Sequence, residues 1–219
     1  MIMTKRSIQL SADLHDYLIA HSSGPDALLE ELAEETAERF APSASMQIGP
    51  EQGTFMTLLT RITGARRAVE VGTFTGYSSI CIARGLASGG RLLCCDVSEE
   101  WTSVARRYWE KAGVADRIEL RIAPALETLR TLDEPVDLAF IDADKVSYLD
   151  YWEELVPRVR PGGVLLVDNT LRGGRVLDEA EQNEDVRAIR AFNEHAARDD
   201  RVELVLLPIG DGLTLATKR

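Results

Sequence analysis

The chain has 219 residues, of which 45% are hydrophobic and 28% charged, an ordinary composition for a protein that closes a sizeable core. Its formal net charge of −11 excludes a general attraction to phosphate backbones or anionic lipids, so we expect neither nucleic acid nor a membrane as partner. There is no apolar run of signal or membrane-helix length, and the three cysteines lack disulfide or zinc spacing, so we expect a cytoplasmic protein.

The first part of the chain is predicted to be helical, over residues 13–20, 26–40 and 50–63. The apolar stripe of the second helix consists of Leu29, Leu32, Thr36 and Phe40. The apolar stripe of the third consists of Phe55, Leu58, Leu59 and Ile62. These helices predict an N-terminal cap, residues 1–63, on a core formed by residues 64–219, the whole chain being one domain.

From residue 65 the pattern changes to strands that alternate with helices. Strands are predicted over residues 67–71, 91–95, 118–122, 136–141, 163–167, 202–207 and 213–217. Helices are predicted over residues 78–86, 99–112, 125–131, 147–159 and 184–198. Strands that are apolar throughout and alternate with helices indicate a parallel sheet covered on both faces. The last two strands are joined by a link too short for a helix, so they should be antiparallel neighbours.

A glycine loop follows the first predicted strand, where residues 70–78 read EVGTFTGYS. Ligands of open α/β sheets bind beyond the carboxyl ends of the strands, and glycines let the backbone approach them closely. The spacing is G-x-x-x-G, not the G-x-G-x-x-G of dinucleotide sites, and Glu70 would repel a pyrophosphate. A ligand with an ammonium and a sulfonium would not be repelled, which favours S-adenosyl-L-methionine over NAD.

The second strand ends at Asp96, 24 residues after Gly72. A carboxylate at this topological position can accept both hydroxyls of a ribose. Taken singly, Glu70 and Asp96 are as well explained as helix caps, because acids are stabilised near helix N-termini. Their occurrence at consecutive strand ends around a glycine loop favours a cofactor site.

Oxygen-bearing side chains follow the fourth and fifth strands, where residues 140–145 read FIDADK and residues 167–171 read VDNTL. If these strands are adjacent and parallel, Asp142, Asp168 and Asn169 meet at one edge of the sheet. Two carboxylates and an amide oxygen suit a hard divalent cation, Mg²⁺ first and then Mn²⁺ or Ca²⁺, better than zinc. A lone aspartate would be only a strand end, but three oxygen ligands favour a metal site.

Residues 70–79, 142–145 and 168–171 resemble the cation-dependent O-methyltransferases typified by the catechol and caffeoyl-CoA enzymes, and the similarity runs from about Met46 to the C-terminus. The resemblance implies an α/β class I methyltransferase fold, a Rossmann-like seven-stranded sheet with an antiparallel last strand and helices on both faces. It also implies S-adenosyl-L-methionine and a divalent cation as cofactors, a small hydroxylated molecule as acceptor, and a homodimer.

The same resemblance implies a role for each site residue. Asp142, Asp168 and Asn169 would hold the cation, and Lys145 would be the general base. The cofactor-binding residues would be Ile48, Glu70, Gly72, Thr73, Tyr77, Ser78, Asp96, Ala125, Asp142 and Asp144. The chain departs from the family at residues 123–125, which lack a frequent glycine, and at Arg172, where an aromatic residue often walls the substrate pocket. Arg172 either contacts an anionic or polar acceptor or lies in solvent.

The expected activity is transfer of a methyl group to a hydroxyl of a catechol-like molecule, because two adjacent oxygens can chelate one metal ion. Two alternatives stay open: an acceptor hydroxyl on a polyketide or sugar-like natural product, and a non-catalytic module that binds S-adenosylmethionine. The module would have no reason to keep Lys145 beside three metal ligands. Methylation of nitrogen or nucleic acid is disfavoured, since residues 142–145 read DADK in place of an Asn-Pro-Pro-Tyr-like segment.

Overall fold

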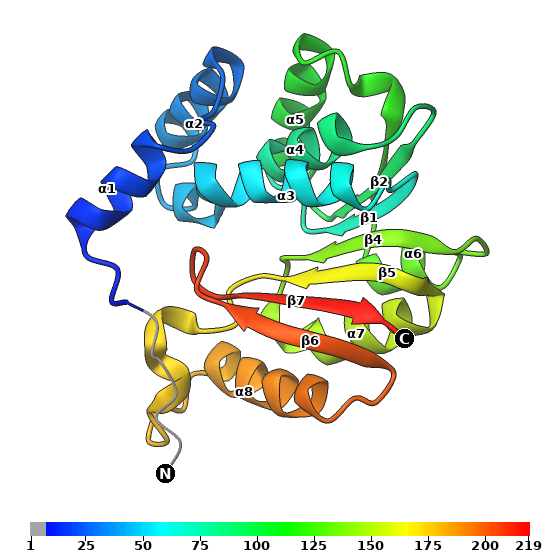
Figure 1. Ribbon diagram of the computed structural model, residues 1–219. Helices are drawn as coiled ribbons and strands as arrows, with labels where there is room; N and C mark the ends of the chain where they lie inside the picture. The colour runs from blue at the N-terminus through cyan, green and yellow to red at the C-terminus, as the bar shows by residue number, and fades with distance from the viewer. Residues whose placement is uncertain (1–7) are drawn as a thin grey trace.

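The computed structural model describes residues 8–219, so the start of the expected cap, residues 1–7, lies outside the described part. Its centre is one seven-stranded sheet of order β3-β2-β1-β4-β5-β7-β6 (Figure 1). The strands are β1 (Arg67–Val71), β2 (Arg91–Asp96), β3 (Ile118–Ile122), β4 (Val136–Ile141), β5 (Val159–Val167), β6 (Val202–Leu207) and β7 (Leu213–Lys218). Pairs from β3 to β5 are parallel, and β7 runs antiparallel to β5 and β6, which confirms the predicted sheet.

The described residues form eight α-helices: α1 (Ala12–Ala20), α2 (Ala27–Arg39), α3 (Pro50–Ile62), α4 (Tyr77–Gly85), α5 (Glu99–Lys111), α6 (Ala125–Leu129), α7 (Tyr148–Arg158) and α8 (Glu184–Ala197). Helices α3, α4 and α5 lie on one side of the sheet and α6, α7 and α8 on the other, as Figure 1 shows. Among the described helices, none combines the length and the apolar character that crossing a membrane requires.

The alternation of strand side chains divides the core into two layers. Cys94 packs in the layer that α2, α3, α4 and α5 cover, whereas its neighbour Cys95 packs in the layer that α6, α7 and α8 cover. Both are free thiols, as expected for adjacent strand residues that point to opposite faces. The inner strands β1 and β4 are buried on both faces over most of their length, which explains why they read as continuous apolar runs.

The predicted apolar stripe of α3 is only partly right: Phe55 and Leu59 are half-buried and pack against the core, but the other two residues do not. Leu58 and Ile62 are 48% and 81% exposed. The buried residues of this helix are Gln52, Gly53, Met56 and Thr60. The reason is the close approach of α4: a Cβ on Gly53 would lie 2.9 Å from Sγ of Cys81. Small residues allow this contact, so the fit between two helices selects the buried face and brings Gln52 into the interior.

The boundary between α7 and β5 also differs from the prediction. Helix α7 ends at Arg158 and β5 begins at once, four residues before the expected start. Val136 pairs with Val159 but Leu138 pairs with Val164, so the ladder contains an irregularity between these pairs. Residues 160–163 include one proline and two glycines, which are tolerated in strands mainly at such bulges.

Candidate active site

A cavity of about 920 Å³ lies at the carboxyl ends of β1, β2, β4 and β5. The sheet order reverses between β1 and β4, and this switch point is where open α/β sheets bind their ligands. The predicted site residues that line the cavity are Ile48, Gly72, Thr73, Tyr77, Ser78, Asp96, Ala125, Asp142, Asp144, Lys145, Asn169 and Arg172. The other two, Glu70 and Asp168, are buried and do not belong to the lining.

Gly72 lies between the two halves of this cavity, one lined by the glycine loop and Asp96 and the other by residues that follow β4 and β5. Its φ is +90°, and a Cβ placed on it would lie 2.0 Å from the carbonyl oxygen of Asp142. A side chain at this position is therefore excluded both by the left-handed backbone and by the end of β4. The glycine lets the loop after β1 pack directly against the strand end that carries the acidic residues.

Asp96 holds the glycine loop in place. Its Oδ2 accepts hydrogen bonds of 2.9 Å from the backbone N–H groups of Thr73 and Phe74, and its Oδ1 accepts one of 2.8 Å from Ser98 N–H. Two carboxylate oxygens offer about four acceptor positions, so a ligand hydroxyl can still be accepted. Asp96 thus binds backbone N–H groups, as a capping acid does, and can still bind a ribose. From the sequence these two roles were alternatives, whereas the structure allows both.

Glu70 is fully buried beneath the loop. Its Oε2 accepts a 3.3 Å hydrogen bond from Sγ of Cys94, while Oε1 has no partner among residues 8–219. Burial raises the pKa of Glu70 to about 8. The nearby hydroxyl of Thr73 is also buried without a partner in the described part of the chain. Buried polar atoms are nearly always paired, so these two indicate a polar ligand group that is to be bound here.

Lys145 lies in a defined hydrogen-bonded arrangement at the other half of the cavity. Its Nζ donates to Oδ1 of Asp142 and to the hydroxyl of Tyr148, both at 2.8 Å. The Tyr148 hydroxyl in turn donates to the backbone carbonyl of Asp168 at 3.3 Å. The side chain of Lys145 is only 11% exposed. Lys145 is therefore not a surface lysine. The nearby Asp144 does not pair with it and accepts instead from the hydroxyls of Ser147 and Tyr151.

Asp168 is 3% exposed and oriented by two donors. Its Oδ1 accepts from the backbone N–H of Asn169 at 2.6 Å, and its Oδ2 accepts from Nε2 of Gln52 at 2.8 Å. Burial, and then the negative charge of Asp142, raise the pKa of Asp168 well above its usual range. Two carboxylates are thus held close enough to repel each other.

The predicted cation ligands fit a hard divalent cation on this observation. Asp142 and Asn169 line the cavity, and the backbone joins Asn169 to Asp168. Lys145 already pairs with Asp142 at 2.8 Å, but Asp168 has no ion-pair partner among residues 8–219, so a positive charge bound to both carboxylates would relieve the remaining repulsion. Each carboxylate oxygen of Asp168 accepts one hydrogen bond and can accept two, so each keeps a lone pair for a metal ion.

Arg172 follows these ligands and is largely buried, with 22% of its side chain exposed. Its guanidinium donates to Oδ2 of Asp185 at 3.1 Å, and its Nε is buried without a partner among the described residues. Arg172 and Asp185 both line the cavity, together with Asp211. Of the two roles considered for Arg172, a freely solvated side chain is excluded.

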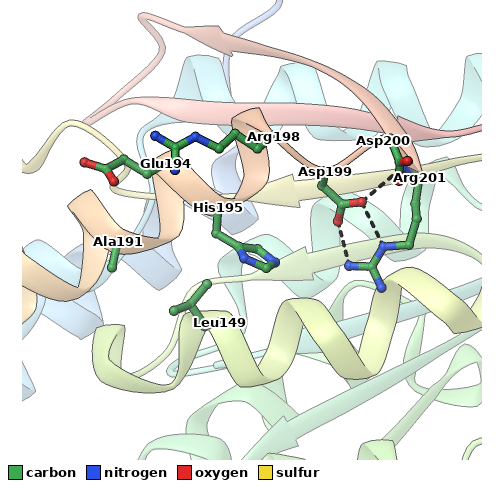
Figure 2. A pocket seen from close by; sticks show the side chains of 8 residues that line it. All are labelled: Leu149, Ala191, Glu194, His195, Arg198, Asp199, Asp200 and Arg201. Carbon is green, nitrogen blue, oxygen red and sulfur yellow. Dashed lines mark hydrogen bonds and ion pairs between the residues drawn. The ribbon is translucent and has the colours of Figure 1, made fainter.

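A second cavity, of about 430 Å³, lies between α7, α8 and the loop before β6 (Figure 2). Its residues are Leu149, Ala191, Glu194, His195, Arg198, Asp199, Asp200 and Arg201. Ligand atoms of Glu153, His195 and Asp199 come within 4.8 Å of one another here. However, Arg201 contacts Glu153 at 2.8 Å and Asp199 at 2.6 Å, so a cation already balances these acids. This group is best explained as an ion-pair network between α7 and α8.

Two residues that hold the predicted site residues in place were not found from the sequence. Tyr148 is fully buried and holds Lys145, and its only signal was the three-residue spacing from that lysine. Gln52 is 1% exposed and contacts Asp168 across 116 residues of sequence. No local pattern marks a glutamine on a helix as the partner of a distant strand end.

Known proteins give an independent comparison. The O-methyltransferase family matches residues 19–219. A probable caffeoyl-CoA O-methyltransferase of Dictyostelium discoideum is 39% identical, over 96% of this chain and 94% of the relative. Catechol O-methyltransferase domain-containing protein 1 of Mus musculus is 38% identical, over 94% of this chain and 79% of the relative. The crystal structure of an O-methyltransferase from Bacillus cereus in complex with SAH superposes with a TM-score of 0.86, at 36% identity, over 94% and 97% of the two chains.

These matches span nearly the whole chain and agree with the sheet order and with the position of the cavity. The two relatives are 39% and 38% identical to this chain, which is enough to indicate a shared family and not only a shared fold. The family match also includes every predicted site residue. The chain therefore belongs to the class I, cation-dependent O-methyltransferase family that includes the caffeoyl-CoA and catechol enzymes.

Proposed function

We propose that this protein transfers the methyl group of S-adenosyl-L-methionine to a hydroxyl of a small catechol-like molecule, with a divalent cation as second cofactor. The observation that carries the proposal is one cavity lined both by the glycine loop with Asp96 and by Asp142, Lys145 and Asn169. The SAH in the Bacillus cereus structure supports the choice of cofactor.

The cofactor half of the cavity fits the polar groups of S-adenosylmethionine. Glu70 lies beneath the loop with an unpaired carboxylate oxygen, suited to an ammonium or sulfonium charge. Asp96 keeps acceptor capacity for a ribose hydroxyl. The further residues proposed to contact this cofactor are Ile48, Gly72, Thr73, Tyr77, Ser78, Ala125, Asp142 and Asp144.

The acidic half would hold the cation through Asp142, Asp168 and Asn169. Mg²⁺ fits this oxygen set best, and Mn²⁺ or Ca²⁺ are the substitutes to test. When bound, such a cation supplies positive charge that favours the ionised form of an acceptor hydroxyl and helps to fix its position. The hydrogen bonds between Lys145 and Tyr148 and between Gln52 and Asp168 restrict where the lysine amine and the carboxylate can lie.

Lys145 is proposed to take the proton from the acceptor hydroxyl. The oxygen then forms a bond to the methyl carbon while the bond from that carbon to sulfur breaks, which leaves S-adenosylhomocysteine. Lys145 can accept a proton only as the neutral amine, so it must first lose one of its own.

The experiment that tests the proposal is transfer of a labelled methyl group to a panel of hydroxylated molecules, with and without Mg²⁺. Methylated catechols formed only with Mg²⁺ are expected. Transfer only to polyketide or sugar-like hydroxyls would replace the proposed acceptor class. Tight binding of S-adenosylmethionine without transfer to any member of the panel would favour a non-catalytic binding module.

Asp96→Ala is expected to weaken S-adenosylmethionine binding by about 1.5–3 kcal/mol, the range for hydrogen bonds to a charged group. The loss has two sources. The variant loses the proposed hydrogen bond to the ribose, and it loses the hydrogen bonds that Asp96 accepts from the N–H groups of the glycine loop. Calorimetric titration measures the change. Asp133→Ala removes an exposed acid at a distant loop and should leave the affinity as it is. Unchanged affinity in folded Asp96→Ala would remove Asp96 from the site.

Arg172→Trp is expected to change acceptor choice more than the chemical step. The cavity would lose a guanidinium and gain an aromatic ring. The rate of methylation of acidic catechols, relative to that of neutral ones, should therefore fall about tenfold, as expected for the loss of a hydrogen bond to a charged group. Competition between two labelled acceptors measures the ratio. Arg175→Trp, at an exposed arginine paired with Glu181, is the matched control. If Arg172→Trp kept the wild-type ratio of acidic to neutral products, Arg172 would have no role in acceptor choice.

A further inference from the structure

Gln52 occupies an unusual position for a polar residue of a helix. It lies in the first turns of α3, is 1% exposed, and points its amide to the end of β5, where Nε2 donates to Oδ2 of Asp168 at 2.8 Å. Burying an amide is costly unless its hydrogen bonds are made. The side chain is therefore held by one strong partner, a carboxylate, and not by packing alone.

A third element restricts the same amide from the other side. Gly210, in the turn between β6 and β7, has a φ of +54°, and a Cβ on it would lie 2.7 Å from Oε1 of Gln52. The glycine leaves the space that the amide oxygen occupies. The amide group is thus confined between the end of β5 and this turn, which limits its rotation about the terminal bond.

The contact has a consequence for Asp168. Its two oxygens each accept one fixed donor, Asn169 N–H on Oδ1 and Gln52 Nε2 on Oδ2. Two donors on opposite oxygens determine the plane of the carboxylate. The Asp168 carboxylate is consequently held in one orientation before any ligand binds.

We propose that Gln52 is a positioning residue for the divalent cation: it orients Asp168 and thereby raises cation affinity, without touching the cation or the cofactor. This rests on the proposed function, because Asp168 must be a cation ligand. Partners that orient a metal ligand typically contribute 10–100-fold in metal affinity. The effect on cofactor binding should be absent, because the Gln52 side chain donates to Asp168 and not to the glycine loop or to Asp96.

The test is Mn²⁺ binding to the full chain, followed by the electron paramagnetic resonance signal of free Mn²⁺. Gln52→Leu removes the donor and keeps the volume, and its dissociation constant for Mn²⁺ should rise by about tenfold or more. Affinity for S-adenosylhomocysteine, measured by calorimetry without metal, should stay within about twofold. Thr60→Val is the matched control, because Thr60 is a buried residue of the same helix that bonds only within it.

A second variant disturbs Gln52 without removing it. Gly210→Ala places a methyl group against the amide oxygen at an exposed turn, so the fold should tolerate it, and Mn²⁺ affinity should again fall. Gly89→Ala controls for the effect of the backbone conformation. Gly89 also has a positive φ, of +72°, but a Cβ on it would meet only Nη2 of Arg66, at an ordinary contact distance of 3.7 Å. This pair still decides the question if Gln52→Leu does not fold.

The outcomes separate this inference from the proposed function. Loss of Mn²⁺ affinity in Gln52→Leu and Gly210→Ala but not in their controls supports positioning. Wild-type Mn²⁺ affinity in either folded test variant overturns it, while a loss of binding in Asp168→Ala keeps the cation site itself. Absence of Mn²⁺ binding to the wild-type chain, with S-adenosylhomocysteine present, overturns both.

Discussion

Lys145→Met should lower kcat by about two or more orders of magnitude near neutral pH while S-adenosylmethionine and the cation bind nearly as before. Proton transfer by a placed general base contributes about 10²–10⁴-fold in rate, and this is the loss expected when the amine is removed. Methionine keeps most of the length of the lysine and removes the amine. Because only the amine can accept the proton, the loss should fall on kcat and not on binding.

Single-turnover methyl transfer with saturating cofactor measures this effect directly. Lys111→Met is the matched control, since Lys111 is a half-exposed lysine of α5 paired with Glu31, far from the cavity. Raising the pH should restore part of the lost rate, because the acceptor hydroxyl then ionises without help. Near-normal turnover at neutral pH would mean that the acceptor needs no base from the protein, and Lys145 would have only the structural role of pairing with Asp142.

Removal of divalent cations should reduce activity to background. Excess EDTA takes away the positive charge that favours an ionised acceptor hydroxyl, and Mg²⁺ or Mn²⁺ should restore turnover. Asp168→Ala should have the same effect in the presence of metal, because it removes a buried ligand that Gln52 and Asn169 orient. The strands at this site are held by their apolar core and by the ladder between β4 and β5, so the replacement should not unfold the sheet.

Initial rates after chelation and readdition provide the measurement, and thermal melting checks that each variant is folded. Glu153→Ala tests the other acidic group, where Arg201 already supplies the positive charge. This variant should respond to EDTA and Mg²⁺ as the wild type does. Full activity after rigorous chelation would leave Asp142 and Asp168 as strand-end acids without a cation.

The order of elements could be predicted because buried parallel strands are apolar on both faces and differ clearly from amphipathic helices. The antiparallel pairing of β6 and β7 followed from a link too short for a crossover. The face of α3 could not be predicted in the same way. Its apolar residues Leu58 and Ile62 are exposed, since the small residue Gly53 lets α4 come close on the other side.

Within the candidate site, the sequence by itself determined the acidic residues that lie at, or directly after, the carboxyl ends of the strands. Glu70, Asp96, Asp142 and Asp168 come together because parallel strands bring their carboxyl ends to one edge, whatever the details of packing. Local sequence was sufficient here because each residue's position depends only on the strand that carries it.

Only the tertiary structure decided which groups hold these residues in place. Tyr148 binds Lys145 because a turn and a helix start follow β4 in one specific geometry. Gln52 reaches Asp168 because α3 packs with its small and polar side inward, a result of contacts with α4 and with the turn at Gly210. The contact between Gln52 and Asp168 joins residues 116 apart in the sequence, and its existence depends on distances between packed elements that no local pattern of residues encodes.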